Sequence, residues 1–343
     1  MLDPNRFRTS SHITGRHRTA WIESGPVDGP LIFFLHGWPE LGIVWHRQLE
    51  HFARLGWRAV APDMRGYGGS SVPTNICSYT IREIVTDMVE LHDNLGGAPA
   101  VWVGHDWGAP IAWSMASHHE YRCRGVVGLS VPYMARGHAF ANLLGLVDRE
   151  IYPQARYPVG QWDYWLFYRE QFGTAVAQME ADVARTLSAL YKPSRQEAFG
   201  KPAITSDVRA RGGWFGTEPL PPADPSSSVL TDYEFSALVS AFIHTGFSGA
   251  NAWYMNDTAN MMFADEAPHF GRISRPALFL HGEWDAVCQT VRGRLADPMR
   301  ADCADLTEEV IKAGHMLMVE QPEAVSVAIE RWLSANHLLH QCS

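Results

Sequence analysis

Short apolar runs alternate with longer amphipathic stretches along the first third of the chain. The apolar runs read as strands over residues 19–23, 31–35, 58–62, 100–104 and 126–131. Their continuous apolar character is typical of parallel strands that are buried on both faces. Between them, apolar residues recur at helical spacing, most clearly over residues 81–95. The alternation predicts a parallel sheet with crossover helices, which is an α/β fold.

This rhythm changes after Pro132, where the chain becomes mostly helical until about residue 265. Helices are predicted over residues 173–191 and 233–245. The alternation then resumes with strands over 277–281 and 306–311 and a closing helix over 322–338. One α/β core interrupted by a helical insertion explains this order. We therefore expect a first core segment (1–132), an inserted helical lid or cap (133–265) and a second core segment (266–343).

Composition excludes several classes of protein. The 343 residues are 46% hydrophobic and 19% charged, which is ordinary globular usage rather than that of a disordered chain. The net charge of −9 disfavours nucleic acid as a partner. No apolar run is long enough to span a bilayer, so no membrane partner is expected. The five cysteines lack paired spacing and favour a reduced, cytoplasmic protein without a zinc or disulfide framework.

The most informative motif is V-W-V-G-H-D-W-G-A-P, at residues 101–110. A buried strand runs directly into a helix there, and small residues allow the sharp turn that exposes a central nucleophile, here Asp106. A carboxylate nucleophile attacks an electrophilic carbon and becomes an ester, which water must then hydrolyse. The alternative is that Asp106 only caps the following helix, which is a common role for aspartate.

Hydrolysis of such an ester requires a histidine base that is held by an acid, and both are expected downstream of the nucleophile. The motif H-G-E-W-D-A-V follows the strand at 277–281, and K-A-G-H-M-L-M follows the strand at 306–311. Asp285 and His315 thus lie at strand ends, where this type of sheet places its site. Glu283 competes with Asp285 for the role of the acid. Asp285 is favoured because it lies deeper in the loop.

Two other motifs follow early strands. L-H-G-W-P-E (residues 35–40) forms a tight turn, and the backbone amides of Trp38 and Trp107 are predicted to form an oxyanion hole. P-D-M-R-G-Y-G-G-S-S (residues 62–71) lacks the third glycine of a dinucleotide loop, because Ser71 occupies that position. It therefore reads as a structural turn. No organic cofactor and no metal are expected.

Together, H-G-W-P-E, D-M-R-G-Y-G-G-S, G-H-D-W-G-A and G-H-M resemble the α/β-hydrolase fold and, within it, the epoxide hydrolases, over nearly the whole chain. This resemblance implies two lid tyrosines that donate hydrogen bonds to the epoxide oxygen. W-D-Y-W-L-F-Y-R-E supplies Tyr164, with Tyr168 as a competitor, and F-S-G-A-N-A-W-Y-M-N supplies Tyr254.

The implied activity is the conversion of a small-molecule epoxide and water to a vicinal diol. The route is an alkyl ester on Asp106, hydrolysed by water that His315 and Asp285 activate, in a monomer or a homodimer. Haloalkane dehalogenases share the H-D-W-G motif and are one alternative. They often carry Asn where this chain has Trp38, which disfavours dehalogenation. A hydrolase-fold protein that binds a ligand without catalysis is the other alternative.

Overall fold

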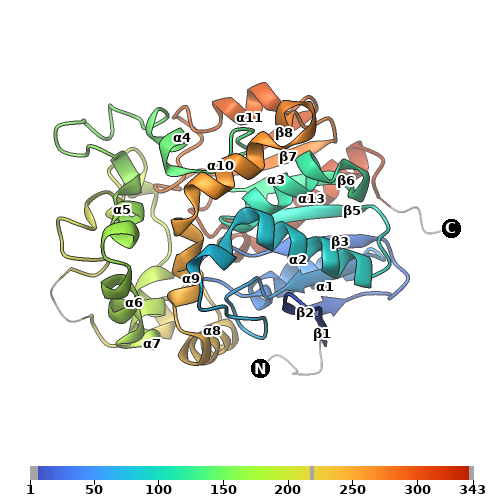
Figure 1. The fold of residues 1–343 in the computed structure, drawn as a ribbon, viewed down its shortest axis with the longest axis horizontal. Coiled ribbons are helices and arrows are strands. Elements are labelled where there is room, and N and C mark those ends of the chain that lie inside the picture. Colours follow the sequence, from blue (N-terminus) through green and yellow to red (C-terminus); the bar gives the residue numbers. More distant parts are fainter. Residues whose placement is uncertain (1–6, 217–219, 340–343) are drawn as a thin grey trace.

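The computed structural model describes residues 7–216 and 220–339 (Figure 1). Its centre is an eight-stranded sheet in the order β1-β2-β4-β3-β5-β6-β7-β8. The first three strands in this order pair antiparallel, and all later neighbours pair parallel. The strands are β1 (Arg8–Ile13), β2 (Arg18–Ser24), β3 (Leu31–Leu35), β4 (Arg58–Pro62), β5 (Ala100–His105), β6 (Cys123–Leu129), β7 (Ala277–Gly282) and β8 (Leu306–Ile311). The α/β fold class predicted from the sequence is confirmed.

Helices cover both faces of this sheet. Consecutive strand residues point to opposite faces, and in β3 Phe33 packs against His92 of α2 whereas Phe34 packs against Phe52 of α1. Helices α1 and α2 therefore lie on opposite sides of the sheet. The core helices are α1 (His46–Arg54), α2 (Ile81–Asn94), α3 (Gly108–His118), α11 (Asp297–Asp302), α12 (Leu317–Glu320) and α13 (Pro322–Ala335). In the described residues, no helix is long and apolar enough to cross a membrane.

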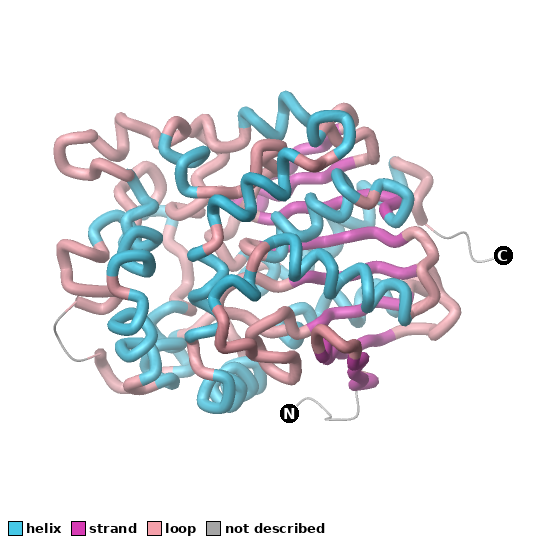
Figure 2. Tube along the Cα trace, in the orientation of Figure 1, coloured by secondary structure: helices cyan, strands magenta, loops and turns pink. Residues whose placement is uncertain are grey.

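Between β6 and β7 the chain leaves the sheet and forms a mostly helical layer beside it, at the left of Figures 1 and 2. Its helices are α4 (Phe140–Leu144), α5 (Asp163–Glu170), α6 (Phe172–Glu180), α7 (Val183–Leu190), α8 (Asp232–Thr245), α9 (Ser248–Ala252) and α10 (Asp257–Asp265). The layer contacts the loop after β3, where Tyr191 donates a hydrogen bond to the carbonyl oxygen of Pro39. The insertion thus covers the edge of the sheet that carries the candidate site. Its exact bounds, 133 and 265, stay a prediction.

Two local expectations were wrong. The single helix predicted over 173–191 is two helices, because Asp182 has an extended backbone and its carboxylate caps α7 by accepting from the amide of Arg185. The edge strand β1 was not predicted, because its side chains are mostly exposed and polar and give no apolar signal. Helix α8, by contrast, begins one residue before the predicted start, at a capping box of Thr231 and Glu234.

The turn between β5 and α3 depends on small residues. A Cβ atom added to Gly104 would lie 2.2 Å from the carbonyl oxygen of Gly108, and one added to Gly108 would lie 2.2 Å from that of Leu35. Both distances are far below van der Waals contact. The strand and the helix can therefore approach closely enough to hold Asp106 at a φ of 48°, in the left-handed region.

We expect Gly108→Ala to destabilise the fold by about 1–3 kcal/mol or more, because the new methyl group would collide with backbone that cannot move aside. Urea unfolding would measure the loss. Gly145→Ala is the matched control, since an added Cβ there meets no atom within 4 Å and the residue has a helical φ of −70°. That control should stay within about 0.5 kcal/mol of the parent. Equal stability of the two variants would contradict this account of the turn.

Candidate active site

Asp106 stands on the turn between β5 and α3, and its carboxylate turns away from the helix. Trp107 is the N-cap residue of α3, and no side chain caps this helix. Instead, Oδ1 of Asp106 accepts a hydrogen bond of 2.7 Å from the backbone amide of Trp38, which lies in the loop after β3. The alternative interpretation of Asp106 as a helix cap is therefore wrong.

His315 lies between two carboxylates. Its Nε2 atom is 3.4 Å from Oδ2 of Asp106, and its Nδ1 atom is 2.8 Å from Oδ2 of Asp285. The other oxygen of Asp285 accepts two backbone amides of the turn that follows it, at 2.9 and 2.8 Å. These bonds fix the carboxylate so that it orients the imidazole. The structure thus pairs His315 with Asp285 rather than with Glu283.

A series of buried polar contacts, which the sequence analysis did not predict, fixes the loop that carries His315. The carbonyl oxygen of His315 accepts a hydrogen bond from Ser130 Oγ at 2.9 Å and lies 2.7 Å from Nε2 of His105. Nδ1 of His105 lies 2.8 Å from Oε1 of Glu40, whose Oε2 accepts the amide of Gly37 at 2.6 Å. These polar contacts connect the loop after β3 to the loop after β8. Glu40 and His105 lie inside the quoted motifs. His105 is the last residue of β5, and a polar residue that ends an otherwise apolar strand is the signal that could have found it.

The charges of the three central groups support one another. Burial raises the pKa of Asp106, but the hydrogen bond and charge of His315 outweigh it and hold that pKa below its usual value. The pKa of Asp285 is lowered in the same way, against burial, chiefly by the charge of His315. Burial lowers the pKa of His315, yet the charge of Asp285 and the hydrogen bonds to both carboxylates raise it well above its usual value. All three shifts favour the charged form of the group, so the contacts between His315 and the two carboxylates stabilise one another.

A cavity of about 360 Å³ opens over this triad, and that volume suits a small organic ligand. Tyr164 of α5 and Tyr254 of the 3₁₀ turn Trp253–Met255 line it, and their ring centroids are 5.5 Å apart. Tyr168 is fully buried and is not among the described residues that line the cavity. The other lining residues are mainly apolar or aromatic near the triad, including Trp38, Trp214, Phe215, Leu190, Val287 and Met316.

Burial raises the pKa of Tyr164 and that of Tyr254 well above the usual value for a phenol. Both hydroxyls therefore keep their protons near neutral pH and can donate hydrogen bonds. They belong to the inserted layer, whereas Asp106 belongs to the sheet. The cavity is thus lined both by hydrogen-bond donors of the inserted layer and by the Asp106 carboxylate of the sheet.

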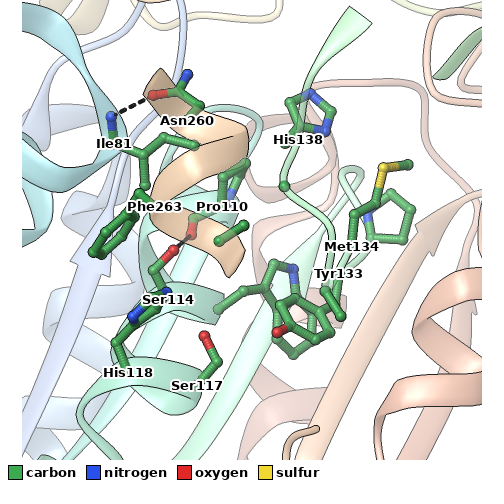
Figure 3. Close-up of a pocket in the computed structure, with 15 residues that line it drawn as sticks. Ile81, Pro110, Ser114, Ser117, His118, Tyr133, Met134, His138, Asn260 and Phe263 are labelled. Carbon is green, nitrogen blue, oxygen red and sulfur yellow. Dashed lines mark hydrogen bonds between the residues drawn. The ribbon is translucent and has the colours of Figure 1, made fainter. Parts of the chain in front are cut away.

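A second cavity lies between α3, α10 and the loop that enters the insertion (Figure 3). Its volume of about 20 Å³ is close to that of a single water molecule. Its lining includes His138, Asn260, Ser117 and Tyr133 and contains none of the candidate catalytic residues. The larger cavity is therefore the candidate active site.

Comparisons with known proteins agree with this fold. A family model described as the alpha/beta hydrolase fold matches residues 30–322. Epoxide hydrolase A of Mycobacterium tuberculosis is 32% identical over 320 residues, which cover 92% of this chain and 94% of that protein. An epoxide hydrolase of Caballeronia sordidicola is 34% identical over 314 residues, or 89% and 88% of the two chains. The crystal structure of epoxide hydrolase A from Mycobacterium thermoresistibile has a TM-score of 0.76 at 30% identity and covers 96% of this chain and 98% of that one.

These matches define the class as the α/β-hydrolase fold. Within that fold, the chain belongs to the epoxide hydrolase family.

The charge arrangement predicts how His315 titrates. In the parent protein the imidazole should titrate well above the usual histidine pKa of about 6.5, because two carboxylates face it. In Asp106→Asn one of these charges is lost, so the pKa should fall towards the ordinary value or below it. Long-range ¹⁵N–¹H NMR of the imidazole nitrogens across a pH series would measure both. Identical titration curves in the two proteins would show that Asp106 does not affect the pKa of His315.

Proposed function

We propose that the protein hydrolyses a small epoxide to a vicinal diol through a covalent alkyl ester on Asp106. The observation that carries this proposal is the position of Asp106. Its carboxylate lies between the amide of Trp38 and the imidazole of His315, in a cavity that Tyr164 and Tyr254 line from the opposite layer. The names of the relatives support the same activity.

In the first step, Asp106 attacks one oxirane carbon through Oδ2. The 3.4 Å contact of this oxygen with His315 is longer than the 2.7 Å hydrogen bond that holds Oδ1 to the amide of Trp38. A carbon–oxygen bond forms to the enzyme as a carbon–oxygen bond of the epoxide ring breaks. Tyr164 and Tyr254 donate hydrogen bonds to the departing oxygen. One of the two tyrosines passes its proton to that oxygen, which becomes a hydroxyl, and the tyrosinate is reprotonated by the proton that His315 gives up in the next step. Such donors act where charge develops in the transition state.

In the second step, water attacks the carboxyl carbon of the ester. Esterification removes the negative charge of Asp106, so His315 loses one of the two carboxylates that raise its pKa. The imidazole then gives up its proton and becomes the base for water, while Asp285 keeps it oriented through Nδ1. The Trp38 amide, together with the amide of Trp107, stabilises the oxyanion. Its collapse breaks the ester carbon–oxygen bond, the departing alkoxide takes the proton of the re-formed carboxyl group, and the diol leaves with Asp106 ionised and His315 protonated again.

A haloalkane dehalogenase would use the same nucleophile but would need donors for a halide ion. The indole nitrogen of Trp38 already donates a hydrogen bond of 2.9 Å to Oδ1 of Asn251. It is therefore engaged within the protein rather than free to bind a halide. Epoxide opening fits better, because the paired tyrosines supply donors for an alkoxide.

Asp106→Asn tests the nucleophile. The substitution keeps the side-chain volume but removes the negative charge, so diol formation should fall by several orders of magnitude while the far-UV circular dichroism spectrum stays unchanged. A chromatographic diol assay on freshly purified protein would measure the loss, because the amide can hydrolyse back to aspartate. Near-parental turnover would exclude Asp106 as the nucleophile, and halide release from haloalkanes by the parent would favour the dehalogenase.

The tyrosines are tested by removal of one hydroxyl at a time. Tyr164→Phe and Tyr254→Phe should each slow epoxide opening by about 10- to 1000-fold, because one donor to the departing oxygen is lost. Single-turnover kinetics would measure the alkylation rate. Tyr168→Phe is the matched control and should have a much smaller effect, since Tyr168 lies outside the cavity lining in the described chain. The opposite order of effects would assign the role to Tyr168.

A further inference from the structure

One nucleophilic group beside the triad has no part in the proposed reaction. The thiol of Cys288 is in the turn after β7, three residues beyond Asp285, and only 4% of the residue is exposed. Asp285, Cys288 and His315 each offer one potential metal-binding atom, and these atoms all lie within 4.8 Å of one another. A carboxylate, a thiol and an imidazole are the side chains that bind Zn²⁺ in proteins.

The distances suit a tetrahedral ion after a small adjustment. Zn²⁺ lies about 2.0–2.2 Å from nitrogen and oxygen ligands and about 2.3 Å from sulfur, so neighbouring ligand atoms are roughly 3.3–3.8 Å apart. Nδ1 of His315 and Oδ2 of Asp285 are 2.8 Å apart. An ion between them would replace the proton that they share and widen the gap by about half an ångström. The thiol, which lies within 4.8 Å of both atoms, would need to approach them by up to about one ångström.

The charges and the access also fit. Burial and the charge of Asp285 raise the pKa of the Cys288 thiol to about 12, so a cation has to displace the thiol proton in order to bind. One carboxylate and the resulting thiolate then balance a divalent cation, and a neutral imidazole completes the set without adding charge. Val287 and His315 line the active-site cavity, and Cys288 directly follows Val287. His315 lies at the cavity wall, and the thiol of Cys288 lies within 4.8 Å of its ring nitrogen, so an ion that enters the cavity reaches His315 first. The fourth ligand position would hold water.

We propose that Asp285, Cys288 and His315 form an inhibitory site for a divalent cation that binds thiolates, such as Zn²⁺. On binding, the thiol proton leaves to solvent, a sulfur–metal bond forms, and the Nδ1 proton of His315 is displaced. The proton that remains on the imidazole is then on Nε2, the atom that faces Asp106. His315 can no longer act as a base, so the hydrolytic step stops. The inhibition rests on the proposed function, whereas the binding does not.

Binding is tested first on the complete chain without substrate. Titration with Co²⁺, which adopts zinc-like sites and is coloured, should produce a near-ultraviolet thiolate-to-cobalt charge-transfer band that saturates at one equivalent. Cys288→Ser should abolish the band. The matched control is Cys77→Ser, which removes an exposed thiol and should keep the band. Absence of a saturable band in the parent, or an unchanged band in Cys288→Ser, would overturn the site.

Inhibition is tested next with Zn²⁺ in the diol assay. The zinc concentration that halves turnover should rise by at least about 10-fold in Cys288→Ser, relative to both the parent and Cys77→Ser. Equal sensitivity of all three proteins would overturn the inhibitory role even if cobalt binds. The cobalt band is measured without turnover. A parent protein that binds cobalt but forms no diol would therefore refute the proposed function and leave the proposed metal binding supported.

Discussion

The site depends on one imidazole, that of His315, held between two carboxylates. His315 receives Asp285 on one nitrogen and Asp106 on the other, and the opposite charges offset the cost of burying all three groups. Removal of either partner from such an arrangement leaves an uncompensated charge, which is expensive in a buried site. This balance favours the ionised form of Asp106, which the proposed mechanism uses as the nucleophile. It also makes the basicity of His315 respond to the state of Asp106, since an ester carries no charge.

Three other features of the fold support this charge arrangement. The close packing of β5 on α3 sets the backbone of Asp106, because an added methyl group at Gly104 or Gly108 would meet backbone at 2.2 Å. The polar contacts through Glu40 and His105 fix the backbone carbonyl of His315. The inserted layer forms part of the cavity wall and supplies Tyr164 and Tyr254. The sheet thus holds the charges, and the insertion holds the donors.

The sequence predicted those parts of the structure whose signals are local. The apolar strands and the turns around Asp106, Asp285 and His315 carry their own signatures. The turns of Asp106 and Asp285 follow the buried strands β5 and β7, whereas that of His315 follows the partly exposed strand β8, and all three turns contain small residues. The roles of Glu40, His105 and Ser130 could not be predicted in this way, because they arise from contacts with residues such as His315 that are far away in the chain. The exposed strand β1 carried no apolar pattern. The break between α6 and α7 had a signal, the cap at Asp182, which the helical periodicity around it concealed.

The central claim is that Asp106 and His315 act in separate steps, and trapping the ester tests it most directly. His315→Gln removes the base but leaves the nucleophile, so the variant incubated with an epoxide should gain the mass of the whole epoxide. Intact-protein mass spectrometry would measure the gain, and peptide mapping should place it on Asp106, with diol production nearly abolished. Asp285→Asn should trap less, because the imidazole loses only its orienting partner. Normal turnover by His315→Gln, or a stalled enzyme without an adduct under saturating epoxide, would contradict the account.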